Sequence, residues 1–147
     1  MGKNNITTKE GVGAYMETIE ILEKQWPLKA FWYSKELEQS ADLHVNDCVE
    51  HESIQPVGSD GSFPNERIAW FCSFGSTWAE SICLGATTAK HIAELLVVSD
   101  GMPTRGNRKN LFNKDLNFIG VSICEHPTAG TICVIDFAEK IGKIGES

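Results

Sequence analysis

Three basic residues, Arg105, Arg108 and Lys109, lie close together in a Gly- and Pro-punctuated stretch that precedes the last predicted strands. Cations grouped in this way could recognise an acidic group on a partner. Alternatively, Arg108 and the nearby Asn110 could tie the loop to a sheet through hydrogen bonds from side chain to backbone. We expect this bracing role for Arg108 and Asn110. All three basic residues remain candidate partner contacts, with Arg105 and Lys109 foremost.

Four histidines could bind a metal ion or transfer protons, but their contexts favour structural roles. His44 falls on a predicted helix, where a partly buried position is expected. His51 follows Cys48 by three residues, a spacing seen in metal sites, yet a solvated loop position is the simpler expectation. His91 is expected on an exposed helix face and His126 in a turn. The sequence contains no convincing Ser/His/Asp or Cys/His nucleophile arrangement and no phosphate-binding loop.

The five cysteines are an odd number, so a fully paired disulfide framework is excluded for a monomer. Buried, reduced thiols are the expected state. Cys124 and Cys133 flank a predicted hairpin and could face each other across it, which makes them the candidate disulfide in an oxidising compartment. The cysteines are Cys48, Cys72, Cys83, Cys124 and Cys133.

The N-terminal part of the chain predicts two amphipathic helices. Thr7 and Glu10 have capping-box spacing, and apolar residues follow at helical intervals. This first helix should end near residue 25, because Trp26 precedes a proline. Ser34 can cap a second helix. The apolar positions of the two helices are Val12, Tyr15, Met16, Ile19 and Leu22, then Leu37, Ala41, Leu43 and Val45.

The remaining chain alternates loops with short elements. Residues 48–65 are loop-like, and a short helix is expected over residues 65–71. A strand is predicted over residues 77–85, and Thr87 or Thr88 can cap a third helix that stops before Gly101 and Pro103. Ile92, Leu95 and Leu96 would pack that helix on the sheet. Two final strands are expected with a six-residue connection, residues 125–130, and a loose tail follows.

These elements predict an α+β fold, a three-layer α-β-α sandwich around a mostly antiparallel sheet. Too few strands alternate with helices for βαβ crossovers, and the last two strands form a hairpin. The 147 residues suit a single domain, with a core over about 8–138 and a tail over 139–147.

Several runs resemble the CAP, or SCP-like, superfamily of cysteine-rich secretory, antigen 5 and pathogenesis-related proteins. They resemble in particular its microbial members with a Gly-His-Arg-Lys-Asn loop. The matching runs are GSDGS-x-P-x-x-R, GNRKNLFN, FIGVSIC and HPTAGTICVIDFA. The resemblance extends from about residue 10 to residue 138 and implies the same α-β-α fold.

In the family, an intact cleft holds two histidines and two acidic residues that can bind a divalent metal. The resemblance places these positions at Pro56, Glu80, Asp100 and Asn107. Two carboxylates are retained, but proline and asparagine stand where the imidazoles would be. We therefore expect a degenerate cleft with no bound zinc and no other cofactor.

The composition of the chain argues against some classes of partner and location. Thirteen basic and 20 acidic residues give a net charge of −7, which argues against nucleic acid. No apolar stretch reaches the roughly 18 residues of a transmembrane helix, and no signal peptide is visible, so a cytoplasmic location is expected. The alternative is a secreted protein whose signal peptide lies outside this sequence. The oligomeric state stays open.

The expected function is a non-catalytic CAP-like binding or scaffold domain, a protein-interacting subunit of a larger intracellular assembly. The alternative is a divalent-metal-dependent hydrolase, or a CAP protein that binds a lipid or glycan, using Glu80 and Asp100 with His51 or His44.

Overall fold

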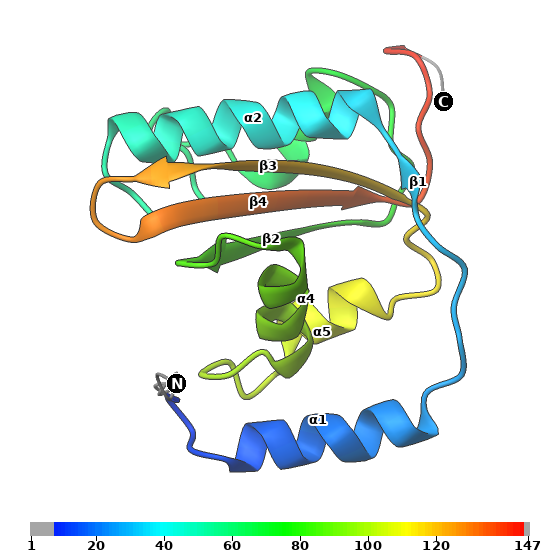
Figure 1. Ribbon diagram of the computed structural model, residues 1–147. Helices are drawn as coiled ribbons and strands as arrows, with labels where there is room; N and C mark the ends of the chain where they lie inside the picture. The colour runs from blue at the N-terminus through cyan, green and yellow to red at the C-terminus, as the bar shows by residue number, and fades with distance from the viewer. Residues whose placement is uncertain (1–7, 146–147) are drawn as a thin grey trace.

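A four-stranded sheet in the order β1-β3-β4-β2 organises the chain (Figure 1). The computed structural model describes residues 8–145. The β2–β4 and β3–β4 pairs are antiparallel, and the β1–β3 pair is parallel. The sheet is therefore mostly antiparallel, as predicted. Its strands are β1 (Trp32–Tyr33), β2 (Trp78–Leu84), β3 (Phe118–His126) and β4 (Gly130–Ala138).

Helices cover both faces of this sheet, so the predicted three-layer sandwich is confirmed (Figure 1). On one face lie α2 (Lys35–Glu50) and α3 (Pro64–Ala69). On the other lie α4 (Ala89–Val98) and α5 (Gly106–Leu111), with α1 (Gly13–Lys24) outside them. The backbone of α2 crosses β3 at Gly120, where an added Cβ would lie 2.2 Å from the α2 backbone. Only glycine fits this approach.

Two helix starts follow the predicted caps. The Ser34 hydroxyl accepts a hydrogen bond from the Leu37 N–H (3.2 Å), and the Thr88 hydroxyl accepts one from the His91 N–H (3.2 Å). These bonds satisfy free N–H groups in the first turns of α2 and α4. The predicted cap Thr7 lies outside the described residues.

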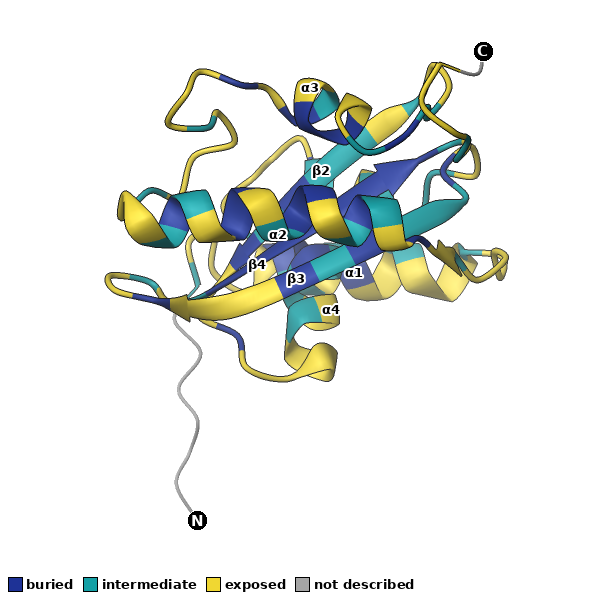
Figure 2. Ribbon diagram, turned by 90° about the horizontal axis from the view of Figure 1, so that it is seen from above, coloured by how far each residue is buried: buried dark blue, intermediate teal, exposed yellow. Residues whose placement is uncertain are grey.

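Strand β4 is buried from residue 132 to its end (Figure 2), and its successive residues contribute in turn to the two halves of the core. Cys133, Ile135 and Phe137 face α4 and α5, whereas Ile132 and Val134 face α2. Leu96 is buried against the first of these clusters, and Ile92 and Leu95 pack on it, as predicted. The two-residue period of a strand thus fills both halves of the sandwich.

Helix α1 buries less of its apolar surface than its amphipathic pattern suggests. Val12, Met16 and Ile19 are 76%, 59% and 51% exposed, and α1 buries Ala14 and Thr18 instead. The helix lies against α4 and the loop before α5, not against the sheet (Figure 1). Part of its apolar stripe therefore remains exposed, and the rest lines an open groove between α1 and α4.

Three details of the predicted C-terminal half are wrong. The connection between β3 and β4 is residues 127–129, because Glu125 and His126 still pair with β4. The stretch predicted as a loop contains α5. The tail, predicted to be loose, is held at Gly142, whose backbone forms two hydrogen bonds with that of Ser73 (3.0 and 2.8 Å).

Cys124 and Cys133, the candidate disulfide for an oxidising compartment, are both free thiols in the structure. In the β3–β4 register, Cys133 lies opposite Ile123 and Cys124 lies opposite Ile132. Neighbouring register positions point to opposite faces of a sheet, so the two sulfurs are separated by the sheet itself.

Candidate functional site

A cleft of about 340 Å³ lies beside β2, and it brings together three of the four positions singled out in the sequence. Pro56 comes from the loop before α3, Glu80 from β2 and Asn107 from α5. The other walls are apolar. They are Ile54, Pro64, Trp78, Ile82, Leu84 and Met102. This surface (the β2 cleft below) is the candidate functional site.

Asp100, the fourth position, does not line the β2 cleft. Its carboxylate accepts hydrogen bonds from the backbone N–H groups of Lys9 (2.8 Å) and Glu10 (3.0 Å). These bonds, the one from Lys9 above all, lower the pKa of Asp100. The predicted cleft role of Asp100 is wrong, because this carboxylate fastens the segment before α1.

Glu80 is held by Arg67, the arginine that ends the GSDGS-x-P-x-x-R run and to which the sequence alone assigned no role. Both Glu80 carboxylate oxygens accept from Nη2 of Arg67 (3.2 and 3.0 Å), and the two side chains are only 3% and 2% exposed. Arg67 also donates to the carbonyls of Pro56 (2.9 Å) and Ser62 (2.9 Å). One guanidinium thus neutralises Glu80 and fixes the loop that forms one wall of the cleft.

A second buried acid, Asp136, lies directly opposite Glu80 on β4. It is fully buried, and neither carboxylate oxygen has a hydrogen-bond partner in the described part of the chain. Burial, and secondly the charge of Glu80, raise the pKa of Asp136 well above its usual value. The sequence did carry a signal for it, an acid within the apolar run CVIDFA.

His44 lies on α2 beneath this network and is fully buried, not partly buried as expected. Its Nε2 donates to the carbonyl of Gln55 (2.8 Å), and burial lowers the pKa of the imidazole. The Cys48 sulfur lies 3.5 Å from the same nitrogen, but burial raises the pKa of Cys48 to about 11. A thiol in that state is not an activated nucleophile.

The other three histidines do not line the β2 cleft. His51 is exposed and pairs with Asp47 (3.1 Å), so it does not restore a metal site. His91 is exposed on α4. His126 supports the hairpin turn, because its Nδ1 accepts from the backbone of Thr128 (3.2 Å) and Ala129 (3.1 Å).

The donors present in the β2 cleft do not suit zinc. Pro56 offers no ligand, Asn107 offers an amide, and both oxygens of Glu80 are bound to Arg67. Among residues 8–145, no three histidine, cysteine or acidic side chains come together in a way that could hold a metal ion.

The basic residues of the loop before α5 have mainly structural partners. Arg105 is buried and forms ion pairs with Glu10 (3.1 Å) and Glu17 (3.0 Å), so its expected role as a partner contact is wrong. Hydrogen bonds from Arg105 and then Arg108 lower the pKa of Glu17 to about 2. Lys109 alone of the three is exposed.

The predicted bracing role is confirmed for Asn110 and changed for Arg108. Asn110 donates to the carbonyl of Glu80 (3.3 Å) and to the Ser81 hydroxyl (3.0 Å), which ties α5 to β2. Arg108 instead donates to the carbonyl of Val97 (2.6 Å) at the end of α4 and to the Thr18 hydroxyl (2.7 Å) on α1. It braces helices and not the sheet.

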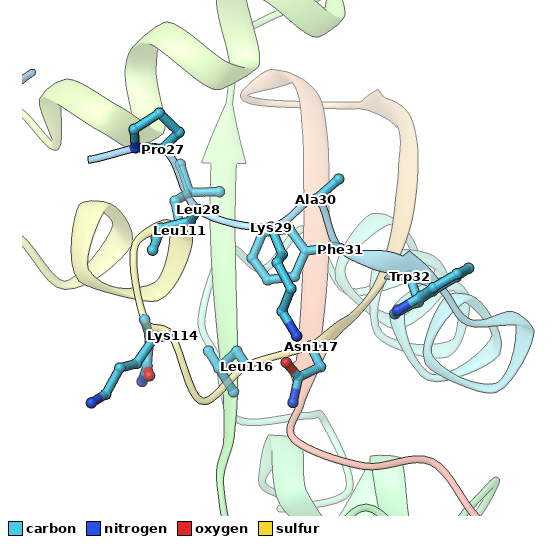
Figure 3. Close-up of a pocket in the computed structure, with 11 residues that line it drawn as sticks. Pro27, Leu28, Lys29, Ala30, Phe31, Trp32, Leu111, Lys114, Leu116 and Asn117 are labelled. Carbon is cyan, nitrogen blue, oxygen red and sulfur yellow. The ribbon is translucent and has the colours of Figure 1, made fainter. Parts of the chain in front are cut away.

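A second cavity, of about 230 Å³, lies between residues 27–32 and residues 111–117 (Figure 3). Its walls include Leu28, Phe31, Leu111 and Leu116, and it shares no residue with the β2 cleft. The Phe31 ring packs on Phe137, with 5.4 Å between centroids. This cavity is a gap beside the core without a cluster of chemically reactive side chains.

The family pattern of the cysteine-rich secretory proteins matches residues 24–137. The chain therefore belongs to the CAP family. No curated protein sequence matches it significantly.

Solved structures show the same fold. An outer surface protein of Borrelia burgdorferi is 22% identical, with a TM-score of 0.66 over 95% of this chain and 99% of that one. An extracellular SCP-domain protein of Bacillus anthracis is 15% identical, with a TM-score of 0.67 over 93% of this chain and 45% of that one. A cysteine-rich secretory protein of Staphylococcus aureus is 12% identical, with a TM-score of 0.55 over 95% and 42%. This chain thus spans less than half of the latter two.

Within residues 8–145, no helix combines the length and the apolar character needed to cross a membrane.

Proposed function

We propose that this CAP domain binds a protein partner through the β2 cleft without catalysing a reaction. The observation that carries the proposal is the engagement of Glu80 by Arg67 inside a cleft whose other walls are mostly apolar. An acid whose two oxygens are already bound to a guanidinium is a fixed part of the cleft wall. Apolar walls with a few placed polar groups are typical of surfaces that bind ligands.

The hydrolase alternative has little support from the same residues. Glu80 is paired, Asp136 is buried in a state that favours its protonated form, and Asp100 is outside the cleft. A general base needs an accessible carboxylate or imidazole within reach of a water or nucleophile. Binding of a small lipid or glycan remains the alternative occupant of the cleft.

The compartment is a separate part of the proposal. A role inside the cell, in a larger assembly, is the expectation from the sequence. The names of the three similar structures, an outer surface, an extracellular and a secretory protein, support the secreted alternative. The state of the thiols, considered in the Discussion, separates the two.

Zinc titration by calorimetry, with elemental analysis of the purified protein, tests the non-catalytic role. We expect no stoichiometric zinc in the purified protein, and we expect Glu80→Gln to leave zinc binding unchanged. The Pro56→His, Asn107→His double variant is the matched control, because it restores an imidazole at both positions and should raise zinc affinity. About one zinc per chain that is lost on Glu80→Gln would contradict the proposal and revive the hydrolase alternative.

A further inference from the structure

Strand β2 is an edge strand, because β4 is its neighbour on one side and no strand of the described chain pairs with its other side. The β2 cleft lies along this open side, between the loop that carries Ile54 and Pro56 and the segment that carries Met102 and Asn107. Unpaired strand edges present N–H and C=O groups that another chain can pair with.

The register shows which of these groups point outward. The Gly85 N–H donates to the Thr131 carbonyl (3.0 Å), and the Glu139 N–H donates to the Thr77 carbonyl (2.9 Å). These two pairs continue the β2–β4 register in both directions. Because hydrogen-bonded and non-hydrogen-bonded pairs alternate in an antiparallel ladder, the even-numbered residues of β2 turn their backbone groups away from β4. They are Trp78, Glu80, Ile82 and Leu84.

Exposure agrees with this assignment. The side chain of Glu80 is only 3% exposed, yet the residue as a whole is not buried, so its main chain reaches solvent. Its carbonyl accepts from Asn110. Within residues 8–145, no hydrogen bond from another element reaches the main chain of Ile82 or Leu84. These two residues therefore offer free backbone donors and acceptors at the cleft.

The chain segment that includes one wall of the cleft is acidic, which bears on the charge of the occupant. Residues 47–66, which include the cleft wall at Ile54 and Pro56, carry five acidic residues and no lysine or arginine. The acids are Asp47, Glu50, Glu52, Asp60 and Glu66. A partner that lies beside this segment would be favoured by basic residues.

We propose that the β2 cleft binds an extended segment of a partner protein, which adds as a strand to the edge of β2 at Ile82 and Leu84. Apolar side chains of the segment would lie against the cleft walls, and flanking lysines or arginines would lie near residues 47–66. Strand addition takes affinity from main-chain hydrogen bonds and specificity from alternate side chains. The inference rests on the proposed binding function and names the class of partner.

The free protein provides the first test. Amide exchange followed by NMR should be at least about tenfold faster at Ile82 and Leu84 than at Ser81 and Cys83, whose N–H groups face β4. Equal protection at all four amides would mean that the edge is closed, and the inference would be wrong.

The second test uses the peptide acetyl-Lys-Val-Thr-Val-Thr-Val-Lys-amide. Binding should slow amide exchange at Ile82 and Leu84 at least about tenfold. The counterpart with glutamate in place of both lysines should bind more weakly, and a peptide N-methylated at alternate residues should lose most of the binding. A peptide that binds without protecting these amides, or no binding at millimolar concentration, would overturn strand addition.

Two variants separate the main chain from the side chain. Leu84→Pro removes the outward N–H without removing a hydrogen bond to β4, so the protein should fold. It should bind the peptide at least about tenfold more weakly than Leu84→Ala, which keeps the N–H. Equal binding by both variants, or by the N-methylated peptide, would show that the cleft takes a different kind of ligand. That result would reject strand addition while leaving a binding role for the cleft, and the zinc measurement separately tests whether the cleft is non-catalytic.

Discussion

At the scale of single residues, the β2 cleft is shaped by a buried network of two acids and one arginine. Glu80 and Asp136 face each other across β2 and β4, and Arg67 neutralises the first. The family resemblance led to Pro56, Glu80 and Asn107, because motif positions can be followed along a sequence. It could not lead to the pairing of Arg67 with Glu80, which depends on how α3 and β2 pack in space.

Removal of Arg67 should destabilise the domain strongly. Arg67→Met leaves the buried carboxylate of Glu80 without its partner, and we expect a loss of about 3 kcal/mol in the free energy of unfolding. Urea denaturation measures it. The Arg67→Met, Glu80→Gln double variant is the control, since removal of both charges should recover part of the loss. If both variants are as stable as the wild type, the ion pair does not hold this region together.

Asp136 should make the stability depend on pH. Between the usual value of 3.8 and the raised pKa in the folded state, the folded protein keeps the proton and the unfolded chain has lost it. The stability due to Asp136 is thus full at low pH and falls as the pH rises through this window. We expect the stability of wild type relative to Asp136→Asn, measured in urea at pH 5 and pH 7, to be smaller at pH 7. A constant difference would contradict a raised pKa.

At the scale of elements, hydrogen bonds and ion pairs of polar side chains position α1 and α5, in place of a continuous apolar core. Arg105 and Arg108 both bind Glu17 of α1, and Arg108 also holds the end of α4. The periodicity of α1 correctly predicted a helix, but periodicity does not say whether the apolar face meets the sheet. The six-residue α5 was missed because its GNRKNL sequence has weak helix propensity, and its form depends on these tertiary contacts.

Loss of Arg105 should loosen α1. An exposed partner contact could be replaced with little loss of stability, but the two ion pairs of Arg105 to Glu10 and Glu17 predict a lower melting temperature for Arg105→Ala. The effect should shrink in high salt, because salt screens these pairs. Thermal denaturation of Arg105→Ala at low and high salt measures both effects. Lys109→Ala is the matched control, since Lys109 is exposed and its loss should change little.

At the scale of the whole molecule, the layered sandwich and the mostly antiparallel sheet were predictable from caps, strand patterns and the family resemblance. The connection of β3 to β4 and the facing of Cys124 were not, because the register of a hairpin depends on which turn forms. The corrected register removes Cys124–Cys133 as a bridge within one chain. The number of free thiols then indicates whether the compartment is reducing. The rate at which each thiol reacts indicates how exposed it is.

A thiol reagent should label Cys124 rapidly in the native protein and the other four cysteines slowly. Cys124 is the one exposed cysteine of the five. Burial raises the pKa of Cys72 to about 11 and of Cys133 to about 12, so little reactive thiolate forms there. After unfolding without reductant, protein from the native source should show five thiols if it resides in a reducing compartment. Fewer than five would support the secreted alternative.

Because strand β1 is short, the sheet has a second open edge on the side opposite β2. Strand β1 pairs only with Phe118 and Ile119, so the far part of β3 is also an edge without a neighbouring strand in the described chain. If the edge of β2 in one copy met the edge of β3 in the next, the contact would repeat without closing, as in a filament. The net charge of −7 opposes such growth, because every added copy brings like charge against the last. The acidity of the chain thus opposes edge-to-edge growth of this sheet, and high salt weakens that repulsion.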